Sequence, residues 1–285
     1  MRVLITADLH YNHPKSQPLA EELIDSINDA GGDVLLVVGD TAASDGDWLE
    51  RCLSRFRFAG EKLFVAGNHE LWTNGPDSFE LFNHQLPRRV RGLGWRWLQD
   101  EPFIAGDATI VGSIGWYDYS LAQESLGIPQ RFYEAKISPG AAEQLDEWSF
   151  LLDREDDVPP HAREVVARWN DGKFVKLKRS DATFTELLCD QLEAQLMARA
   201  GKRIIAAIHH LPFRELLPPP RTAQWDFAKA YLGSRRLGEV LLRCPAVTKV
   251  FCGHSHFPAE ATVGHIRAVN IGSGYRDKTY KVLDV

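Results

Sequence analysis

The sequence contains few cysteines, and no two of them lie close together along the chain. Only four occur in 285 residues, and none forms a C-x-x-C motif. This distribution gives no sign of a disulfide framework and indicates a protein that is kept reduced. The four positions are Cys52, Cys189, Cys244 and Cys252. Because Cys252 follows an apolar run, we expect it to be a small buried side chain.

Long hydrophobic runs are also missing from the sequence. No stretch approaches the roughly 18 uninterrupted apolar residues that a membrane helix needs. The apolar run that begins at Val3 reaches Asp8 too soon for the core of a signal peptide. We therefore expect a cytoplasmic protein without membrane association.

An excess of basic residues is a third absence. Lysine and arginine number 33 against 39 acidic residues, and the net charge is −6. Nothing global in this balance indicates a nucleic-acid partner, although a local basic patch is left open. With 44% hydrophobic and 25% charged residues, the composition is that of a globular protein with a substantial core.

The first third of the chain alternates between strand and helix patterns. Continuous apolar runs predict strands at 2–7, 33–38 and 62–66. Helices are predicted between them at 19–30 and 46–56, and the first is stopped by Gly31 and Gly32. This order predicts parallel strands joined by right-handed crossovers and covered on both faces.

The later part of the chain returns to this pattern after an interruption. Helices are predicted at 181–200 and 226–243, and further strands at 95–99, 103–106, 108–115, 203–208, 247–252, 259–263, 266–271 and 279–283. Residues of about 116–180 do not follow the α/β pattern, and we interpret them as an inserted cap or excursion. The sequence thus predicts one α/β domain, residues 1–285, with an insertion at about 116–180.

Polar residues of metal-binding types follow five of the predicted strands. In open α/β sheets, ligands bind at the carboxyl ends of the strands. Any one of these short motifs could be a turn or a helix cap, but five together are hard to explain by packing. The residues at these strand ends are Asp8, His10, Asp40, Asn68, His69, Glu70, His209, His210, His254 and His256.

The residue types at the strand ends indicate a site for two metal ions. Carboxylates, imidazoles and an amide without thiolates suit Mn²⁺, Fe²⁺ or Zn²⁺. Seven of these residues are candidate ligands: Asp8, His10, Asp40, Asn68, His209, His254 and His256. Seven are too many for one tetrahedral zinc, and they suit two ions about 3.5–4 Å apart that share a carboxylate. We expect Asp40 to be the shared ligand. Asp8, His10 and one of the two histidines at 254 and 256 would complete the coordination of one ion. Asn68, His209 and the other of these two histidines would complete that of the second.

Two such ions would activate a bridging water and hold the oxygens of a phosphorus centre. His69, beside the ligand Asn68, could then protonate the leaving-group oxygen or stabilise the charge that builds there. Glu70 could orient His69, or it could be a helix-start residue favoured by the helix dipole.

In these motifs the sequence resembles the calcineurin-like metallophosphoesterase superfamily. The pattern D-x-H, G-D, G-N-H-[DE], H and G-H-x-H appears in order at residues 8–10, 39–40, 67–70, 209 and 253–256. The resemblance implies a four-layer αββα sandwich and His69 as the proton donor. It assigns His209, rather than His210, as a ligand, and leaves His210 to approach the substrate or to be buried. The implied ligands are Asp8, His10, Asp40 and His256 for one metal and Asp40, Asn68, His209 and His254 for the other.

Departures from the pattern narrow the branch of this superfamily. Tyr11 replaces the glycine of the D-x-H-G motif, and "GDTAASDG" lacks the arginine that protein phosphatases carry. We also expect neither the signal peptide nor the second domain of the periplasmic nucleotidases. The chain is therefore most similar to small bacterial cytosolic phosphodiesterases and phosphatases.

The function implied is hydrolysis of a nucleotide or other small phosphodiester by a metal-bridging hydroxide, with Asp40 and His69 as catalytic residues. The implied cofactors are two divalent metal ions (Mn²⁺, Fe²⁺/Fe³⁺ or Zn²⁺), and the partner is a small-molecule phosphoester. A phosphomonoesterase with the same site is the alternative. A non-catalytic scaffold is disfavoured because all the motifs are intact. Oligomeric state and native substrate are left open.

The excursion is expected to determine substrate specificity. Trp116, Tyr117 and Tyr119 could stack on a base or fill the core, and we favour core packing. A basic run could meet phosphate, but a solvated face of mixed charge is favoured because acidic residues lie near it. This run comprises Arg163, Arg168, Lys173, Lys176, Lys178 and Arg179.

Overall fold

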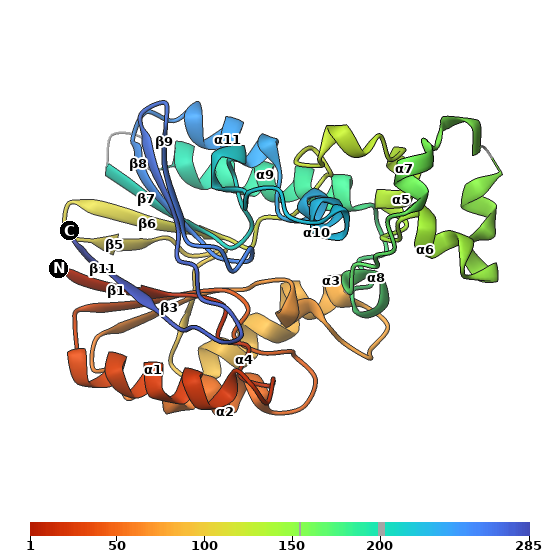
Figure 1. Cartoon of the computed structure of the whole chain (residues 1–285). Helices are drawn as coiled ribbons and strands as arrows, with labels where there is room; N and C mark the ends of the chain where they lie inside the picture. The colour runs from red at the N-terminus through yellow and green to blue at the C-terminus, as the bar shows by residue number, and fades with distance from the viewer. Residues whose placement is uncertain (154, 199–202) are drawn as a thin grey trace.

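Two β-sheets face each other, and helices cover the outer face of each (Figure 1). The structure is a computed structural model that describes residues 1–153, 155–198 and 203–285. This arrangement confirms the predicted four-layer αββα sandwich. None of the helices in these described residues is long and apolar enough to cross a membrane.

The first sheet has the strand order β11-β1-β2-β3-β4, in which β1 to β4 are parallel and β11 is antiparallel to β1. The strands are β1 (Arg2–Thr6), β2 (Val34–Val38), β3 (Glu61–Val65), β4 (Arg96–Trp97) and β11 (Tyr280–Asp284). Helices α1 (Gln17–Ala30), α2 (Trp48–Arg55) and α4 (Leu86–Gly92) lie on its outer face. The predicted parallel crossovers are therefore present.

The second sheet has the order β5-β6-β7-β8-β10-β9, with β6, β7, β8 and β10 parallel and with antiparallel strands at both edges. Its strands are β5 (Phe103–Ala105), β6 (Ala108–Ser113), β7 (Arg203–Ile208), β8 (Val247–Cys252), β9 (Ala259–Val263) and β10 (Ile266–Asn270). Helices α9 (Asp181–Met197) and α11 (Arg235–Leu242) cover its outer face.

Alternation along each strand builds both the core between the sheets and the cores beneath the helices. In β1, Val3 and Ile5 belong to the cluster between the two sheets, whereas Leu4 belongs to the cluster that contains α1. In β7, Ile205 points into the same inter-sheet cluster and Ile204 into the cluster that contains α11. Burial on both faces explains the continuous apolar runs. It also leaves the strand ends as the places where polar side chains gather.

The excursion, residues 116–180, forms only short helices and turns among its described residues. These are η3 (Glu124–Leu126), α5 (Gln130–Glu134), α6 (Pro139–Glu143), η4 (Asp146–Leu152), η5 (Glu155–Asp157), α7 (Pro160–Arg163) and α8 (Asp171–Phe174). Figure 1 shows α5, α6 and α7 projecting from the two-sheet body, while α8 lies nearer to it. Trp116 and Tyr117 are completely buried, which confirms that they fill the core, and Tyr119 is half-buried. The predicted domain limits stay a prediction.

Several predicted elements have different bounds in the structure. The helix predicted at 226–243 is three segments: α10 (Ala223–Ala228), η7 (Lys229–Tyr231) and α11. Gly233 separates η7 from α11, and a side chain at this position would collide with the Leu211 carbonyl. The Ser234 hydroxyl caps α11. The strand predicted at 95–99 shortens to Arg96–Trp97. Residues 199–200 of the helix predicted at 181–200 lie outside the described residues.

Three further helical segments between β3 and β4 were not assigned from the sequence. They are α3 (Ser78–Glu80), the π-helical η2 (Leu81–Gln85) and α4. Two short 3₁₀ helices lie after strand ends. The first, η1 (His69–Leu71), follows β3, and the second, η6 (Arg214–Leu216), follows the loop after β7. Of these, η1 carries predicted site residues.

Candidate metal centre

The loops that follow five parallel strands meet at one edge of the sandwich. The loop after β1 is bonded to the loop after β2, since the backbone N–H groups of Asp8 and His10 donate to the carbonyls of Gly39 and Asp40. In the second sheet, the Gly253 N–H donates to the His209 carbonyl. These bonds join the motifs within each sheet, and the bond from the His254 backbone N–H to Asp8 Oδ1 joins the two sheets.

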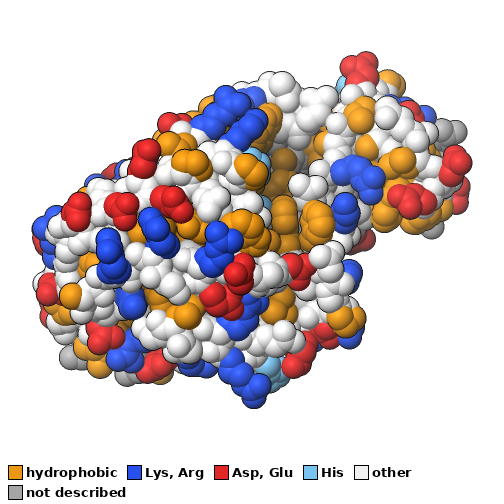
Figure 2. All heavy atoms as spheres, turned by 90° about the horizontal axis from the view of Figure 1, so that it is seen from below, with side chains coloured by type: hydrophobic (Ala, Val, Ile, Leu, Met, Phe, Trp, Pro, Cys, Tyr) orange, Lys and Arg blue, Asp and Glu red, His pale blue; other side chains and the backbone are white. Residues whose placement is uncertain are grey.

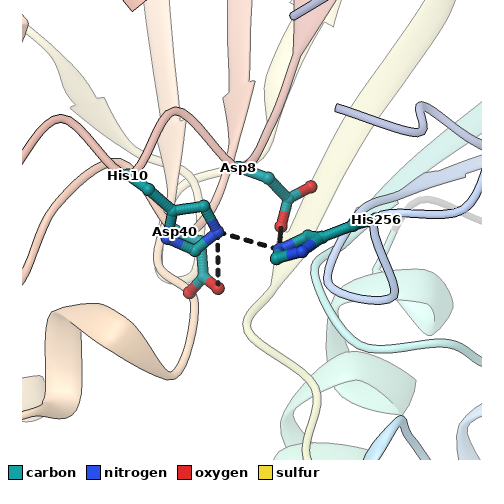
Figure 3. Close-up of side chains that lie close together, drawn as sticks. All are labelled: Asp8, His10, Asp40 and His256. Carbon is teal, nitrogen blue, oxygen red and sulfur yellow. Dashed lines mark hydrogen bonds and ion pairs between the residues drawn. The ribbon is translucent and has the colours of Figure 1, made fainter. Parts of the chain in front are cut away.

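One group of predicted ligands contains Asp8, His10, Asp40 and His256 (Figure 3). His10 Nε2 lies 2.8 Å from His256 Nε2 and 3.9 Å from Asp40 Oδ2. His256 Nε2 is 3.6 Å from Asp8 Oδ1. Asp8, His10 and Asp40 are almost completely buried, and their polar atoms converge on one point with His256.

A second group contains His209 and His254 and shares Asp40 with the first. His209 Nε2 lies 3.2 Å from Asp40 Oδ1, while His209 Nδ1 bonds the Val38 carbonyl at 2.8 Å. His254 Nε2 bonds the Tyr231 carbonyl at 3.1 Å, so its Nδ1 is the nitrogen left for the site. In each ring, one nitrogen is fixed as a donor to a carbonyl and the other is left for the site.

The two histidines after β7 are placed differently. His210 is completely buried, and its Nδ1 bonds the Ile114 carbonyl at 2.9 Å. It belongs to neither group, whereas His209 does. The geometry therefore favours His209 as a ligand and gives His210 a buried position behind it, 4.2 Å from His254 between ring centroids.

The backbone at the strand ends is strained. Eight non-glycine residues in the described part of the chain have positive φ, and five of them are predicted ligands. Left-handed backbone costs a non-glycine residue roughly 1–3 kcal/mol, and it concentrates at functional sites. The five residues are Asp8, His10, Asp40, His254 and His256. This strain is a signature of the site that is independent of side-chain type.

Glycines in the motifs allow the ligands to approach one another. A Cβ on Gly67 would lie 2.2 Å from Asp40 Oδ1, and one on Gly253 would lie 2.3 Å from Asp8 Oδ2. Such distances are impossible for real atoms, so both positions require glycine. The G-N-H-E and G-H-x-H motifs therefore begin with glycine because a side chain there would displace a carboxylate.

Burial and neighbouring charges shift the ionisation of these groups. Burial lowers the pKa of His254 and of His256 to about 3 and also lowers the pKa of His10, so these imidazoles are neutral, as metal ligation requires. Burial alone would raise the pKa of Asp40, but the positive charge of His209 holds it well below its usual range. In turn, Asp40 raises the pKa of His209 to about 9, against the opposing effect of burial. The shared carboxylate is therefore ionised.

Unpartnered polar atoms show that the residues fit bound cations. Buried atoms of predicted ligands that have no hydrogen-bond partner among the described residues include Asp8 Oδ2, Asn68 Oδ1, His209 Nε2 and His254 Nδ1. A buried polar atom without a partner costs about 1–3 kcal/mol. Divalent cations would satisfy these oxygen and nitrogen atoms, and burial raises the pKa of Asp8, which a cation would reverse.

His69 lies beside both groups without belonging to either. Its Nε2 is 3.8 Å from Asp40 Oδ2, and its backbone N–H donates to Asp40 Oδ1 at 3.0 Å. The ring stacks on Trp72, with 3.7 Å between ring centroids. Burial lowers its pKa, against the opposing effect of Asp40. This position, next to the shared carboxylate and open to the cavity, suits contact with a substrate atom.

Glu70 lies in the first turn of η1, as one of its two predicted roles has it, and its carboxylate has a further role. Its carboxylate accepts four backbone hydrogen bonds, from Gly67, Asp40, Thr41 and Ala42, at 2.6–3.1 Å. These bonds go to the loops after β2 and β3 and not to the His69 ring. Glu70 therefore fixes the position of the loop after β2 relative to the loop after β3.

A cavity of about 230 Å³ opens over the site. Asp40, Asn68, His69, His254 and His256 contribute to its floor, and its walls are largely aromatic. The remaining lining residues are Trp72, Arg168, Trp169, Asn170, Trp225, Leu232, Ser255 and Tyr275. Figure 2 shows a hollow at the surface with hydrophobic side chains on its walls and histidine visible within it.

Several residues of the site were missed in the sequence. Tyr275 stacks on His10 at 4.4 Å, and the Lys278 ammonium donates to the Asp8 carbonyl. Trp169 comes from the excursion, as does Asp171, whose carboxylate bonds the Asn68 amide. Arg168, which the sequence placed in a basic run, also lines the cavity. No periodicity or strand-end position marks these residues, because they reach the site from loops and from the short helix α8. The basic and aromatic run in the excursion is the one local signal that points to them.

A two-sheet α/β sandwich with overlapping aspartate and histidine groups at its strand ends defines a metallohydrolase of the dinuclear type. The calcineurin-like phosphoesterase family matches residues 1–258, so this chain belongs to that family. The family and the fold expected from the sequence are confirmed. The expected enzyme class, a hydrolase of phosphoric esters, is likewise confirmed at the level of the family.

Individual relatives agree with this assignment. The [acyl-carrier-protein] phosphodiesterase PptH of Mycobacterium tuberculosis (strain ATCC 25618 / H37Rv) is 36% identical over 129 residues, which cover 41% of this chain and 38% of that protein. The crystal structure of the same phosphopantetheinyl hydrolase has a TM-score of 0.69 at 21% identity, covering 96% of this chain and 89% of that one. A dimetal phosphatase from Danio rerio has a TM-score of 0.55 at 15% identity, with coverages of 96% and 88%. The two structural matches show a shared fold.

Proposed function

We propose that the chain is a dinuclear metal-dependent phosphodiesterase. The observation that carries this proposal is the pair of ligand groups that share Asp40, with His69 beside them on the floor of the cavity. Asp8, His10, Asp40 and His256 would hold one ion, and Asp40, Asn68, His209 and His254 the other. Mn²⁺, Fe²⁺/Fe³⁺ and Zn²⁺ all suit this donor set.

When bound, the two ions supply an activated water and neutralise charge on the phosphoryl oxygens. The chain's own residues position the reaction around them. Asp40 joins the two groups, and the His254 N–H donates to Asp8 Oδ1 at 2.9 Å, which connects the strand ends of the two sheets. His69, oriented by Trp72 and by its own backbone bond to Asp40, presents its ring to the leaving-group oxygen.

The proposed substrate is a phosphodiester that joins a phosphopantetheinyl group to a carrier protein. Similarity to a relative named as an acyl-carrier-protein phosphodiesterase supports it, and so does a cavity with room beyond the site for an organic group. Aromatic walls from Trp72, Trp169 and Trp225 suit apolar contact, and Arg168 at the rim suits an anionic group. A nucleotide or other small phosphodiester is the second candidate, because the same walls would stack a base. In either case we place the reaction in the cytoplasm.

Model esters test the reaction class. The protein is treated with a chelator, supplied with Mn²⁺, and assayed on bis(p-nitrophenyl) phosphate and on p-nitrophenyl phosphate. We expect faster cleavage of the diester and its loss on renewed chelation. Faster cleavage of the monoester would instead support the phosphomonoesterase.

Mass spectrometry of a phosphopantetheinylated acyl-carrier protein tests the substrate. We expect its mass to fall by that of the phosphopantetheinyl group, with the unmodified carrier protein as the product. A carrier protein of unchanged mass, together with rapid hydrolysis of a cyclic nucleotide in a parallel assay, would replace this substrate with a nucleotide.

A further inference from the structure

Asp171 is a completely buried carboxylate in the excursion, and four side chains donate hydrogen bonds to it. Its Oδ1 accepts from Asn68 Nδ2 at 2.9 Å and from Trp72 Nε1 at 2.6 Å. Its Oδ2 accepts from the Tyr117 hydroxyl at 2.9 Å and from Trp169 Nε1 at 2.8 Å. Charged groups are rarely buried so deeply without a specific purpose, and all four donors here are neutral.

The bond to Asn68 decides which end of the amide faces the metal centre. The oxygen and the NH₂ group of an asparagine are nearly equal in shape, so packing alone does not distinguish the two orientations. An ionised carboxylate accepts hydrogen bonds but does not donate them. Asp171 therefore binds the Asn68 NH₂ group, and Asn68 Oδ1 is left buried and without a partner on the other side. A cation requires this oxygen and would be repelled by the NH₂ group.

The other bonds of Asp171 fix the aromatic walls around the centre. Trp72, held through its indole N–H, stacks on His69. Trp169, held in the same way, stacks on Tyr231 at 5.1 Å, and the Tyr231 carbonyl bonds His254 Nε2. One carboxylate thus supports Asn68 directly and His69 through Trp72. It supports His254 more remotely, through Trp169 and then the Tyr231 carbonyl.

We propose that Asp171 is a positioning residue of the metal centre, which selects the ligating orientation of Asn68 and orients the His69 ring. The inference rests on the proposed function only in that it takes Asn68 to be a metal ligand. It gives the excursion a part in building the centre as well as in covering it. Carboxylates that bond a metal ligand in this way alter metal affinity or activity by about 10–100-fold when they are removed.

Asp181 provides a matched control. It is also a buried carboxylate, and it accepts bonds from Trp116 Nε1, the Tyr119 hydroxyl and the Lys136 ammonium. Like Asp171, it joins the excursion to the body, but it bonds none of the predicted ligands. Asp171→Asn and Asp181→Asn therefore each remove a buried carboxylate, of which only Asp171 contacts the centre. The Asp181 change also breaks the ion pair with Lys136.

The test is titration of each metal-free protein with Mn²⁺, followed by electron paramagnetic resonance, alongside melting temperature and steady-state kinetics. We expect Asp171→Asn to weaken one of two bound ions by about 10–100-fold and to lower kcat more than it raises KM. Asp181→Asn should lower the melting temperature but bind both ions as the wild type does. Equal metal affinities in Asp171→Asn and the wild type, or equal losses in the two variants, would overturn the inference.

A second pair of variants gives a readout that a general loss of stability would not produce. Asn68→Asp places a second carboxylate beside that of Asp171, so the two repel each other, and binding of the same ion should become weaker. Combining Asn68→Asp with Asp171→Asn exchanges donor and acceptor, and the double variant should bind Mn²⁺ more tightly than either single variant. Merely additive losses would contradict the inference. If Asp171→Asn alone is too unstable to purify, Asn68→Asp and the double variant supply the comparison.

The metal readout separates this inference from the proposed function. A wild-type protein that binds two ions but cleaves no phosphodiester would end the proposed function, while the affinity difference between the two variants would still support Asp171. A wild-type protein that cleaves the diester with Asp171→Asn equally active and equally metal-bound would end the inference alone.

Discussion

The strand ends and the excursion supply the site in different ways. Every residue in the two ligand groups comes from a loop that directly follows a parallel strand. Arg168, Trp169 and Asp171 come instead from a segment of short helices and turns. The first region provides the atoms that can hold metal, and the second provides part of the cavity wall and the support of one ligand.

This difference follows from how each region is stabilised. The strand-end loops are bonded to one another by the backbone and by Glu70, so their geometry is a consequence of the sheet. The excursion is attached to the body through side-chain bonds, among them those of Asp171 and Asp181, and through backbone bonds such as that from the Thr73 N–H to the Phe174 carbonyl. Aromatic packing around Tyr117 and Tyr231 adds to this attachment. We therefore expect changes at the strand ends to affect the reaction itself and changes in the excursion to affect binding and positioning.

The largest effect is expected from Asp40→Asn, because this carboxylate belongs to both ligand groups. An asparagine keeps the size but removes the charge that two cations share. We expect kcat/KM on bis(p-nitrophenyl) phosphate to fall by at least about 10³-fold, with reduced metal content by elemental analysis. Asp284→Asn, at an exposed carboxylate in β11, is the control. Turnover by Asp40→Asn at the wild-type rate would remove the strand ends from the reaction.

His69→Gln should come next, and its effect should depend on the leaving group. General acid catalysis contributes about 10²–10⁴-fold, so we expect about a 10²-fold loss of kcat on an alkyl phosphodiester. The loss should be much smaller on a p-nitrophenyl ester, because p-nitrophenolate departs without a proton. Metal content should stay at the wild-type level, since His69 is outside both groups. Equal losses on the two esters would show that His69 does not act on the leaving group.

The strand ends could be predicted from the sequence because their geometry is dictated by local rules. Apolar runs identify buried strands, parallel order brings their carboxyl ends together, and the polar residues that follow must then meet. These rules alone bring Asp8, Asp40 and His209 to one edge of the fold. Their positive φ angles and the close approach of Gly67 to Asp40 belong to tertiary geometry and are not visible in the sequence.

The excursion could not be predicted in this way. Asp171 lies in a short helix without periodicity, and its four donors are separated from it by between 2 and 103 residues in sequence. Glu70 shows the same limit within a motif: its position was known, but its bonds to Asp40 and Thr41 depend on a neighbouring loop. Likewise, the break at Gly233 in the predicted helix 226–243 comes from contact with Leu211. Each of these features is set by a distant segment that no local pattern records.

Removal of metal should lower the stability of the folded protein, and a variant of the strand ends can be compared in this respect with a variant that affects the excursion. A ligand at about 100 times its dissociation constant stabilises the folded state by about 2.7 kcal/mol, which corresponds to about 4–5 °C for a chain of this size. We expect a chelator to lower the melting temperature of the wild type by at least this much. The shift should shrink in Asp40→Asn and persist in Asp181→Asn, as measured by calorimetry. A melting temperature that chelation does not change would mean that no cation occupies the buried groups.

The smallest effect should come from Arg168→Gln at the rim of the cavity. Arg168 has a side chain 55% exposed and a loose contact of 3.9 Å with Glu147, so its replacement should leave stability almost unchanged. If the excursion determines binding, KM for an anionic diester should rise up to about 10-fold while kcat and metal content stay constant. Lys178→Gln is the matched control, because Lys178 is similarly exposed at 62% but pairs with Asp77 away from the cavity. A fall in kcat with KM unchanged would place Arg168 with the strand-end residues, and the division between the two regions would have to be redrawn.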